Sequence, residues 1–250
     1  MSRQTRIGGL LWVSVIQYFV LLLVVRSAWT LPYDPLTYAI SDLGAATCGE
    51  FAGRQVCSPW HALAQASWVL AGATLATGAV LTRHVFGSRS GTGLLVLSGL
   101  GEIGVGLFPE DVSAWHVPCA LMAVGCGLLG VLLLGRGVRE RPGLRALGWA
   151  GVATGTVGLA ALVVTVAFPR HLFGLVERIG VYPILLWFLA AGVTILCLRP
   201  ARRHNTPGDT PYGKPHAEHS GRYPGRRRSH RPGGRADRAD PHGRPLDRAR

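Results

Sequence analysis

Long apolar stretches separated by short polar turns make up the first four-fifths of the chain. Six of these stretches reach roughly the 20 residues that a helix needs to cross a bilayer core. They consist mainly of Leu, Val, Ala and Gly. The pattern predicts an all-α fold, a polytopic transmembrane bundle of six helices at about residues 7–25, 61–81, 91–108, 115–134, 144–168 and 179–198.

The apolar pattern stops near residue 198, which divides the chain into two regions. Residues 199–250 are rich in Arg, Pro, Gly and His and contain almost no large apolar side chains. Such a segment buries too little apolar surface to offset its conformational entropy. We therefore predict a transmembrane domain over residues 1–198, followed by a disordered basic tail over residues 199–250.

Composition supports the membrane assignment and indicates which classes of partner the protein has. Hydrophobic residues make up 48% of the chain and charged residues only 16%, unlike an ordinary soluble domain. The net charge of +13 would be typical of a protein that binds nucleic acid. However, the basic tail directly follows a predicted span, where attraction to anionic lipid head groups explains it. We expect the bilayer and anionic head groups as partners, no nucleic acid and no cofactor, and leave a homo-oligomer or a membrane partner open.

Arginine is unevenly distributed between the two sets of connections. One set contains two arginines before residue 7 and further groups between the second and third, and fourth and fifth, stretches and after the last one: Arg3, Arg6, Arg83, Arg89, Arg136, Arg139, Arg141, Arg145, Arg199, Arg202 and Arg203. The other set has Arg26, Arg54, Arg170 and Arg178. The positive-inside rule predicts that both termini are cytoplasmic, in a bacterial inner membrane. The first stretch is longer than a signal-peptide core, so we expect it to be retained.

Glycines line one face of the fifth predicted helix. Gly148, Gly151, Gly155 and Gly158 recur at spacings of three and four, which places them on one side of a helix. Small residues let helices approach closely in lipid. This face is predicted to pack against another helix.

Polar residues that are uncommon in membrane proteins gather on the predicted outer side. They are Ser41, Asp42, His61, Glu110, Asp111, His116, His171, Glu177 and Arg178. Arg178 can pair with an opposite charge on another loop, for instance Asp42 or Asp111. Glu102 is the single acid inside a predicted span, and a carboxylate at that depth must face the bundle interior, carry a proton or have a partner. A functional role and a structural hydrogen bond to Gln65 or Ser67 both remain open for it.

Two further groups on this side suggest chemistry. Cys48 and Cys57 share the first outer loop, where oxidising conditions allow a disulfide, although two independent thiols are the alternative. His61, Asp111 and His116 are candidates for a zinc site or a proton shuttle. Their spacing matches no tight metal motif, so side chains that only cap helices and form hydrogen bonds are the alternative.

Several short motifs give the chain a family resemblance. They are Ile40-Ser41-Asp42-Leu43-Gly44, Ser58-Pro59, Gly106-Leu107-Phe108-Pro109-Glu110 with His116, and Gly174-Leu175-Val176-Glu177-Arg178-Ile179 with Tyr182-Pro183 and Trp187. In this order and spacing, the chain from about Leu10 to Leu198 resembles the prokaryotic membrane family called domain of unknown function 998.

The resemblance implies a shared topology but no settled activity or cofactor. The motif positions that carry over are Ser41, Asp42, Pro59, Phe108, Pro109, His116, Glu177 and Arg178. One position departs from the family pattern, because an Asn is expected early in the second helix where this chain has Gln65-Ala66-Ser67.

Three functions are compatible with these observations. The first is a small transporter or lipid-interacting protein with an outward-facing polar pocket, with Glu102 at its floor and Asp42, His116, Glu177 and Arg178 at its rim. The second is a non-catalytic partner subunit that uses the glycine-lined faces and the tail. The third is a membrane-embedded hydrolase in which His61, Asp111 and His116 hold a metal ion that activates water.

Overall fold

The computed structural model describes residues 2–167 and 172–198 of the chain. The predicted disordered tail, the last residue of the predicted fifth span and His171 lie outside these residues. The chain divides into two units, of which the first covers Met1–Arg202. Everything below concerns that unit.

Helices form most of the described structure. In chain order they are α1 (Arg3–Val13), α2 (Ile16–Ser27), α3 (His61–Phe86), α4 (Arg89–Leu107), α5 (His116–Val138), α6 (Arg145–Ala167) and α7 (Phe173–Cys197). Counting α1 and α2 as one span, the described residues contain six helices long and apolar enough to cross a membrane. The prediction of a six-helix transmembrane bundle is confirmed, and the protein is a multi-pass membrane protein.

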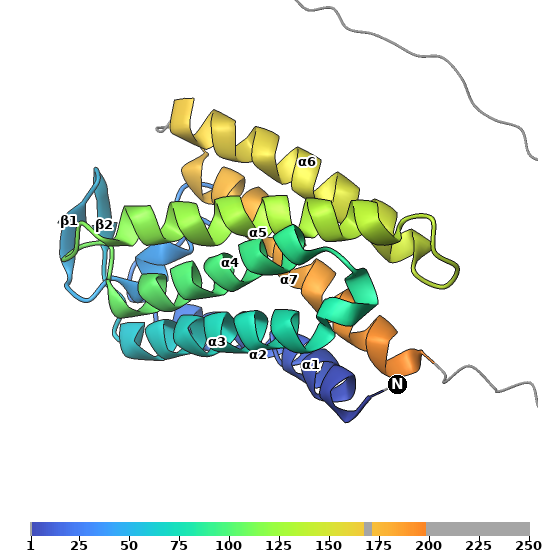
Figure 1. Cartoon of the computed structure of the whole chain (residues 1–250). Coiled ribbons are helices and arrows are strands. Elements are labelled where there is room, and N and C mark those ends of the chain that lie inside the picture. Colours follow the sequence, from blue (N-terminus) through green and yellow to red (C-terminus); the bar gives the residue numbers. More distant parts are fainter. Residues whose placement is uncertain (1, 168–171, 199–250) are drawn as a thin grey trace, which may run out of the picture. The chain divides into compact units, whose positions relative to one another are not determined.

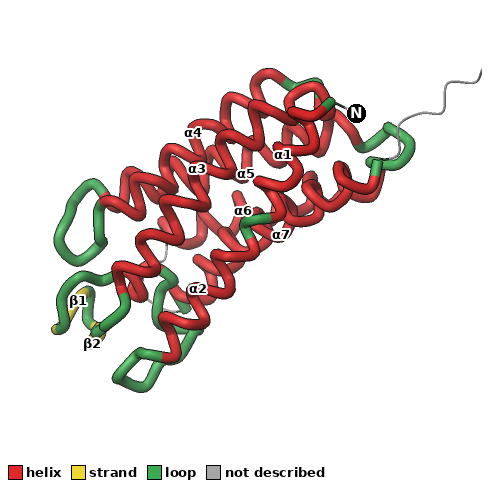
Figure 2. The backbone as a smooth tube through the Cα atoms, turned by 90° about the horizontal axis from the view of Figure 1, so that it is seen from below, coloured by secondary structure: helices red, strands yellow, loops and turns green. Residues whose placement is uncertain are grey.

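The first span is broken, which the apolar pattern did not predict. The Ser14 hydroxyl donates to the Leu11 carbonyl at 2.7 Å, and the amides of Gln17 and Tyr18 donate to carbonyls three rather than four residues back. A serine that bonds to the preceding turn often bends a helix. The break between α1 and α2 is visible as a short non-helical segment (Figure 2).

Consecutive spans run in opposite directions, so that the connections gather at two ends of the bundle (Figure 1). At one end, a short helix η1 (Ser41–Gly44) and an antiparallel hairpin of β1 (Gly49–Phe51) and β2 (Arg54–Val56) lie near the starts of α3 and α5. We call this the hairpin end. The opposite end carries the N-terminus and the end of α7, with Arg3, Arg83, Arg89, Arg136 and Arg145, and we call it the arginine end.

The glycines of α6 face α5, which confirms the predicted helix contact. A Cβ on Gly148 would lie 2.5 Å from the Arg139 Cα, and one on Gly155 would lie 2.8 Å from the Leu128 carbonyl oxygen. Both distances are too short for real Cβ atoms, because backbone atoms occupy the space. The two helices therefore approach each other as closely as glycine allows.

Candidate functional site

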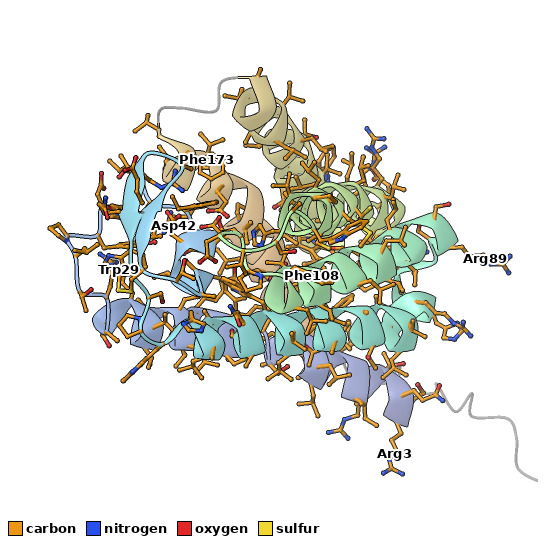
Figure 3. The ribbon with its side chains drawn as sticks, turned by 90° about the vertical axis from the view of Figure 1, so that its left-hand side faces the viewer. Arg3, Trp29, Asp42, Arg89, Phe108 and Phe173 are labelled. Atoms are coloured by element: carbon orange, nitrogen blue, oxygen red, sulfur yellow. A yellow bond between two sulfur atoms is a disulfide. The ribbon has the colours of Figure 1, made fainter. Side chains whose placement is uncertain are left out.

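The hairpin end brings together most of the polar residues that the sequence singled out. η1 is buried against α3 and α2, and Asp42 within it has no exposed surface. Figure 3 looks onto this end, with Asp42 and Phe173 beside the hairpin, while Arg3 and Arg89 point away from the bundle. A fully buried carboxylate needs partners.

Arg54 and a backbone amide supply those partners for Asp42. Arg54 donates from Nη2 to Oδ1 at 2.8 Å and from Nε to Oδ2 at 3.1 Å. Oδ2 also accepts from the Ala39 amide at 2.7 Å. Burial opposes the charge on Arg54, but the bonds to Asp42 outweigh this effect and raise the pKa of the guanidinium.

The hairpin presents Arg54 at this position. Ala52 and Gly53 both have positive φ angles, of 50° and 76°, which is the requirement for a two-residue turn whose twist matches the strands. Cys48 and Cys57 flank the ladder and are joined in a disulfide. The predicted disulfide is confirmed and the alternative of two independent thiols is wrong. The hairpin itself was not predicted from the sequence.

Glu177 and Arg178 fix the loop that precedes η1. Glu177 accepts a hydrogen bond from the Ile40 amide. Arg178 donates from Nη1 to the carbonyls of Pro35, Tyr38 and Gly174 at 2.7 to 2.8 Å, and from Nη2 to the Tyr33 hydroxyl. The expected pairing of Arg178 with Asp42 or Asp111 is wrong, because backbone carbonyls occupy its donors and Arg54 occupies Asp42.

Glu110 reaches Asp42 and Ser41 from the connection between α4 and α5. Its carboxyl interacts with the side chains of Ser41 and Asp42, while its Oε1 atom is buried without a hydrogen-bond partner. Burial raises the pKa of Glu110 well above its ordinary value, and the Asp42 carboxylate raises it further. Because two adjacent negative charges repel each other, this position favours the protonated form of Glu110.

The three candidate metal ligands are engaged separately. Asp111 accepts from the Ala46 amide and from the amide and hydroxyl of Thr47 at 2.7 to 2.9 Å. Partial burial alone would raise the pKa of Asp111, but these hydrogen bonds prevail and lower it.

The histidine rings bond to nearby carbonyls, His116 Nδ1 to Phe108 at 2.7 Å and His61 Nδ1 to Ser58 at 3.0 Å. In the part of the chain that the structure describes, no three His, Cys, Asp or Glu side chains come together as metal ligands. The hypothesis of a metal site made by His61, Asp111 and His116 is therefore wrong for this arrangement.

Glu102 lies deeper in the bundle, as its position in the sequence suggested. It borders a cavity of about 20 Å³ together with Ser98, Ala123 and Ile184. The proposed partners are engaged elsewhere: Gln65 donates to the Gly44 carbonyl and Ser67 donates to Gln17. The expected hydrogen bond of Glu102 to either residue is absent from the described structure.

An open cleft of about 1140 Å³ lies beside Arg54 and Glu110. We call it the hairpin cleft, and its lining residues are Thr37, Phe51, Ala52, Gly53, Arg54, Glu110, His116, Val117, Leu172 and Phe173. Of the predicted site residues, His116 lines it directly and Asp42 reaches it through Arg54, whereas Glu102, Glu177 and Arg178 of the predicted pocket do not line it. Glu110, which the sequence placed on the outer side but not in the predicted pocket, lines it as well. Arg54 and the phenylalanines were missed by the sequence reasoning. A glycine between two flanking cysteines was the available signal for the hairpin that carries Arg54.

Comparison with known proteins places the chain in a family without a known activity. Residues 7–194 match the family model described as "Protein of unknown function (DUF998)". This match covers nearly the whole bundle and all the predicted site residues. No curated protein and no solved structure matches the chain.

Proposed function

We propose that this protein, which belongs to the DUF998 family, is a lipid-interacting membrane protein that binds the hydroxyl-bearing head group of an amphiphile in the hairpin cleft. One observation carries the proposal. A cleft of about 1140 Å³ combines Arg54, Glu110 and His116 with the aromatic rings of Phe51 and Phe173. Ligand sites are commonly apolar pockets with a few convergent polar groups.

The polar groups offer both donors and acceptors. His116 Nδ1 must donate to the Phe108 carbonyl, because a carbonyl only accepts, so Nε2 of the neutral ring is left as an acceptor. Glu110 also lines the cleft, but its carboxyl interacts with Ser41 and Asp42 and its Oε1 atom is buried. Arg54 keeps its Nη1 donors, because Asp42 uses only Nε and Nη2. Hydroxyl groups, which donate and accept, complement this set.

The surroundings of the cleft favour an amphiphile over a water-soluble ligand. Val117 and Leu172 line the cleft and are 62% and 47% exposed, and neighbouring Trp115 is 66% exposed. Trp is enriched at the membrane–water interface, where its amphipathic ring fits. A head group in the cleft can therefore remain attached to acyl chains in the adjacent bilayer.

Two further observations favour lipid binding over the other hypotheses. Deeper in the bundle, the cavity at Glu102 has a volume of about 20 Å³, which is room for roughly one water molecule. This small volume argues against passage of a larger solute through the described residues. The glycines expected to bind a partner subunit instead face helices of the same chain, such as Gly148 against Arg139.

Orientation completes the proposal. The arginine end carries many more arginines than the hairpin end, so the positive-inside rule favours a cytoplasmic arginine end and an outward-facing cleft. In a bacterial inner membrane, the cleft would then take its ligand from the outer leaflet.

Native mass spectrometry of the detergent-purified protein tests the proposal. We expect glucosyl diacylglycerol to bind more tightly than diacylglycerol, which offers a single glycerol hydroxyl, or phosphatidylcholine, whose head group has none. His116→Ala should weaken the glycolipid by about fivefold, since a hydrogen bond contributes ~1 kcal/mol. Glu50→Gln, an exposed acid of the same hairpin outside the cleft, is the matched control and should change nothing. Equal binding of all three lipids, or no effect of His116→Ala, would overturn the proposal.

A further inference from the structure

A second recess at the hairpin end lies between α2 and α7 and shares no lining residue with the hairpin cleft. Its volume is about 330 Å³. The residues that matter for its chemistry are Phe19, Leu23, Arg26, Tyr33, Arg178 and Tyr182. We call it the lipid groove.

Two guanidinium groups meet one aromatic ring at the polar end of the groove. The Cζ atoms of Arg26 and Arg178 lie 5.1 and 5.9 Å from the centroid of the Tyr33 ring. Arg178 is also held by the Tyr33 hydroxyl and by backbone carbonyls, so its position is fixed. Such contacts orient a guanidinium without neutralising it.

Arg26 differs from Arg178 because its donors are unused. Its side chain is exposed in the last turn of α2, and the Tyr33 ring is its sole partner within residues 2–167 and 172–198. Glu177 is the nearest acid in sequence to Arg178, but it accepts from the Ile40 amide and does not line the groove. The groove therefore presents net positive charge.

The remaining wall of the groove is apolar and faces along the span. Phe19 and Tyr182 pack edge to face, with ring centroids 5.3 Å apart, and Leu23 is 65% exposed. Phe19 lies two turns before Arg26 on the same helix, which is about 10 Å along the axis at ~1.5 Å per residue. A cation at the membrane interface thus stands above an apolar wall that begins within the hydrocarbon region.

We propose that the lipid groove binds one anionic glycerophospholipid from the leaflet at the hairpin end. The phosphate lies against Arg26, whose planar guanidinium can bind two phosphate oxygens at once, and Arg178 adds to the local positive charge. An acyl chain packs on Phe19, Leu23 and Tyr182. This proposal goes beyond the proposed function, because neither its residues nor the charge of its ligand are those of the hairpin cleft.

The experiment measures binding of phosphatidylglycerol to the full chain in detergent by native mass spectrometry. Wild-type protein should retain one phosphatidylglycerol more tightly than phosphatidylcholine. Arg26→Gln should weaken phosphatidylglycerol by about fivefold, the order of effect of one arginine near an anionic lipid. Arg89→Gln, which removes an equally exposed charge at the arginine end, is the matched control and should not weaken it.

Three outcomes decide the matter. Glycerol 1-phosphate at the same concentration should fail to displace the lipid, because the acyl chain contributes; full displacement would instead indicate a site for free phosphate esters and overturn the proposal. Unchanged phosphatidylglycerol binding in Arg26→Gln would also overturn it. Phosphatidylglycerol also carries hydroxyls, so phosphatidic acid, whose head group is the phosphate alone, separates this site from the hairpin cleft. Its binding should be weakened in Arg26→Gln and unchanged in His116→Ala, whereas glucosyl diacylglycerol binding should be unchanged in Arg26→Gln.

Discussion

Arg54 donates to both carboxylate oxygens of Asp42, a residue with no exposed surface. Because the same carboxylate accepts from the Ala39 amide, it joins the loop before η1, η1 itself and the hairpin. The Arg54 side chain is 20% exposed, which leaves its outer edge available to the hairpin cleft. One ion pair therefore attaches the hairpin to the bundle and fixes the position of Arg54 at the edge of the hairpin cleft.

Removal of Asp42 should destabilise the protein strongly. Asp42→Ala leaves the Arg54 guanidinium partly buried without its counter-charge and the Ala39 amide without an acceptor. Loss of one partner from a buried pair costs about 3 kcal/mol. We expect a clear fall in Tm, measured by circular dichroism in detergent.

The control for this change lies on the same hairpin. Glu50→Gln removes an exposed acid that has no side-chain partner among the described residues, and should leave Tm unchanged. The double variant Asp42→Asn with Arg54→Gln should be less damaging than Asp42→Ala, because no charge is left unpaired. If Asp42→Ala unfolds at the same temperature as Glu50→Gln, the ion pair does not hold the hairpin.

The helical spans could be predicted because the bilayer imposes their length and polarity on the sequence. The site was predictable only as a set of unusual polar residues. Which atoms they contact depends on how the loops fold over the bundle. Arg178 donates to backbone carbonyls, and every residue type has a carbonyl, so the sequence cannot indicate which ones it contacts. The partner of Asp42 was missed for the same reason, since Arg54 reaches it only once the hairpin has formed.

The break in the first span shows a different limit. The apolar pattern runs through Ser14 without interruption, because a single serine barely lowers the hydropathy of a span. Its hydroxyl nevertheless redirects the backbone bonds by donating to Leu11. Hydropathy predicts where a chain crosses the membrane and not where the crossing helix bends.

The disulfide predicts a simple labelling pattern. The chain has five cysteines, and Cys119, Cys126 and Cys197 are free. Iodoacetamide should modify three cysteines in the denatured, unreduced protein and five after reduction, as read by mass spectrometry. Replacing both Cys48 and Cys57 by Ser should also destabilise the protein by about 2–3 kcal/mol, through release of a short loop. Cys197→Ser is the control and should have no such effect.

Close packing of α5 and α6 predicts that one glycine tolerates alanine and another does not. A Cβ on Gly148 would lie 2.5 Å from the Arg139 Cα, so Gly148→Ala must separate the helices and should cost about 1–3 kcal/mol. A Cβ on Gly125 would meet only Leu162, at 3.8 Å. Gly125→Ala should therefore be neutral or slightly stabilising. Equal Tm values for both variants in detergent would contradict the packing.

The proposed orientation can be tested with single cysteines in a variant that lacks the three free ones. Ala114, exposed at the hairpin end, and Arg89, exposed at the arginine end, are suitable positions. In intact cells, a membrane-impermeant maleimide should label Ala114→Cys and should label Arg89→Cys only after permeabilisation. The reverse pattern would place the hairpin cleft in the cytoplasm.

The buried carboxyl of Glu110 predicts a pH dependence of unusual sign. Its folded-state pKa is raised above the ordinary value of 4.5, first by burial and then by Asp42. A raised pKa means that the folded state holds the proton more tightly than the unfolded state. Its favourable contribution is thus complete below pH 4.5 and is lost as the pH rises through the folded-state pKa.

Glu110→Gln, which resembles the protonated acid, should therefore match the wild type near pH 4 and exceed it in Tm at pH 8. Asp111→Asn should show the opposite trend, because hydrogen bonds from Ala46 and Thr47 lower the pKa of Asp111 and its contribution is lost as the pH falls. Thermal unfolding of the two variants and the wild type between pH 4 and pH 8 measures both slopes. A Glu110→Gln variant no more stable than the wild type at pH 8 would mean that Glu110 is ionised in the fold.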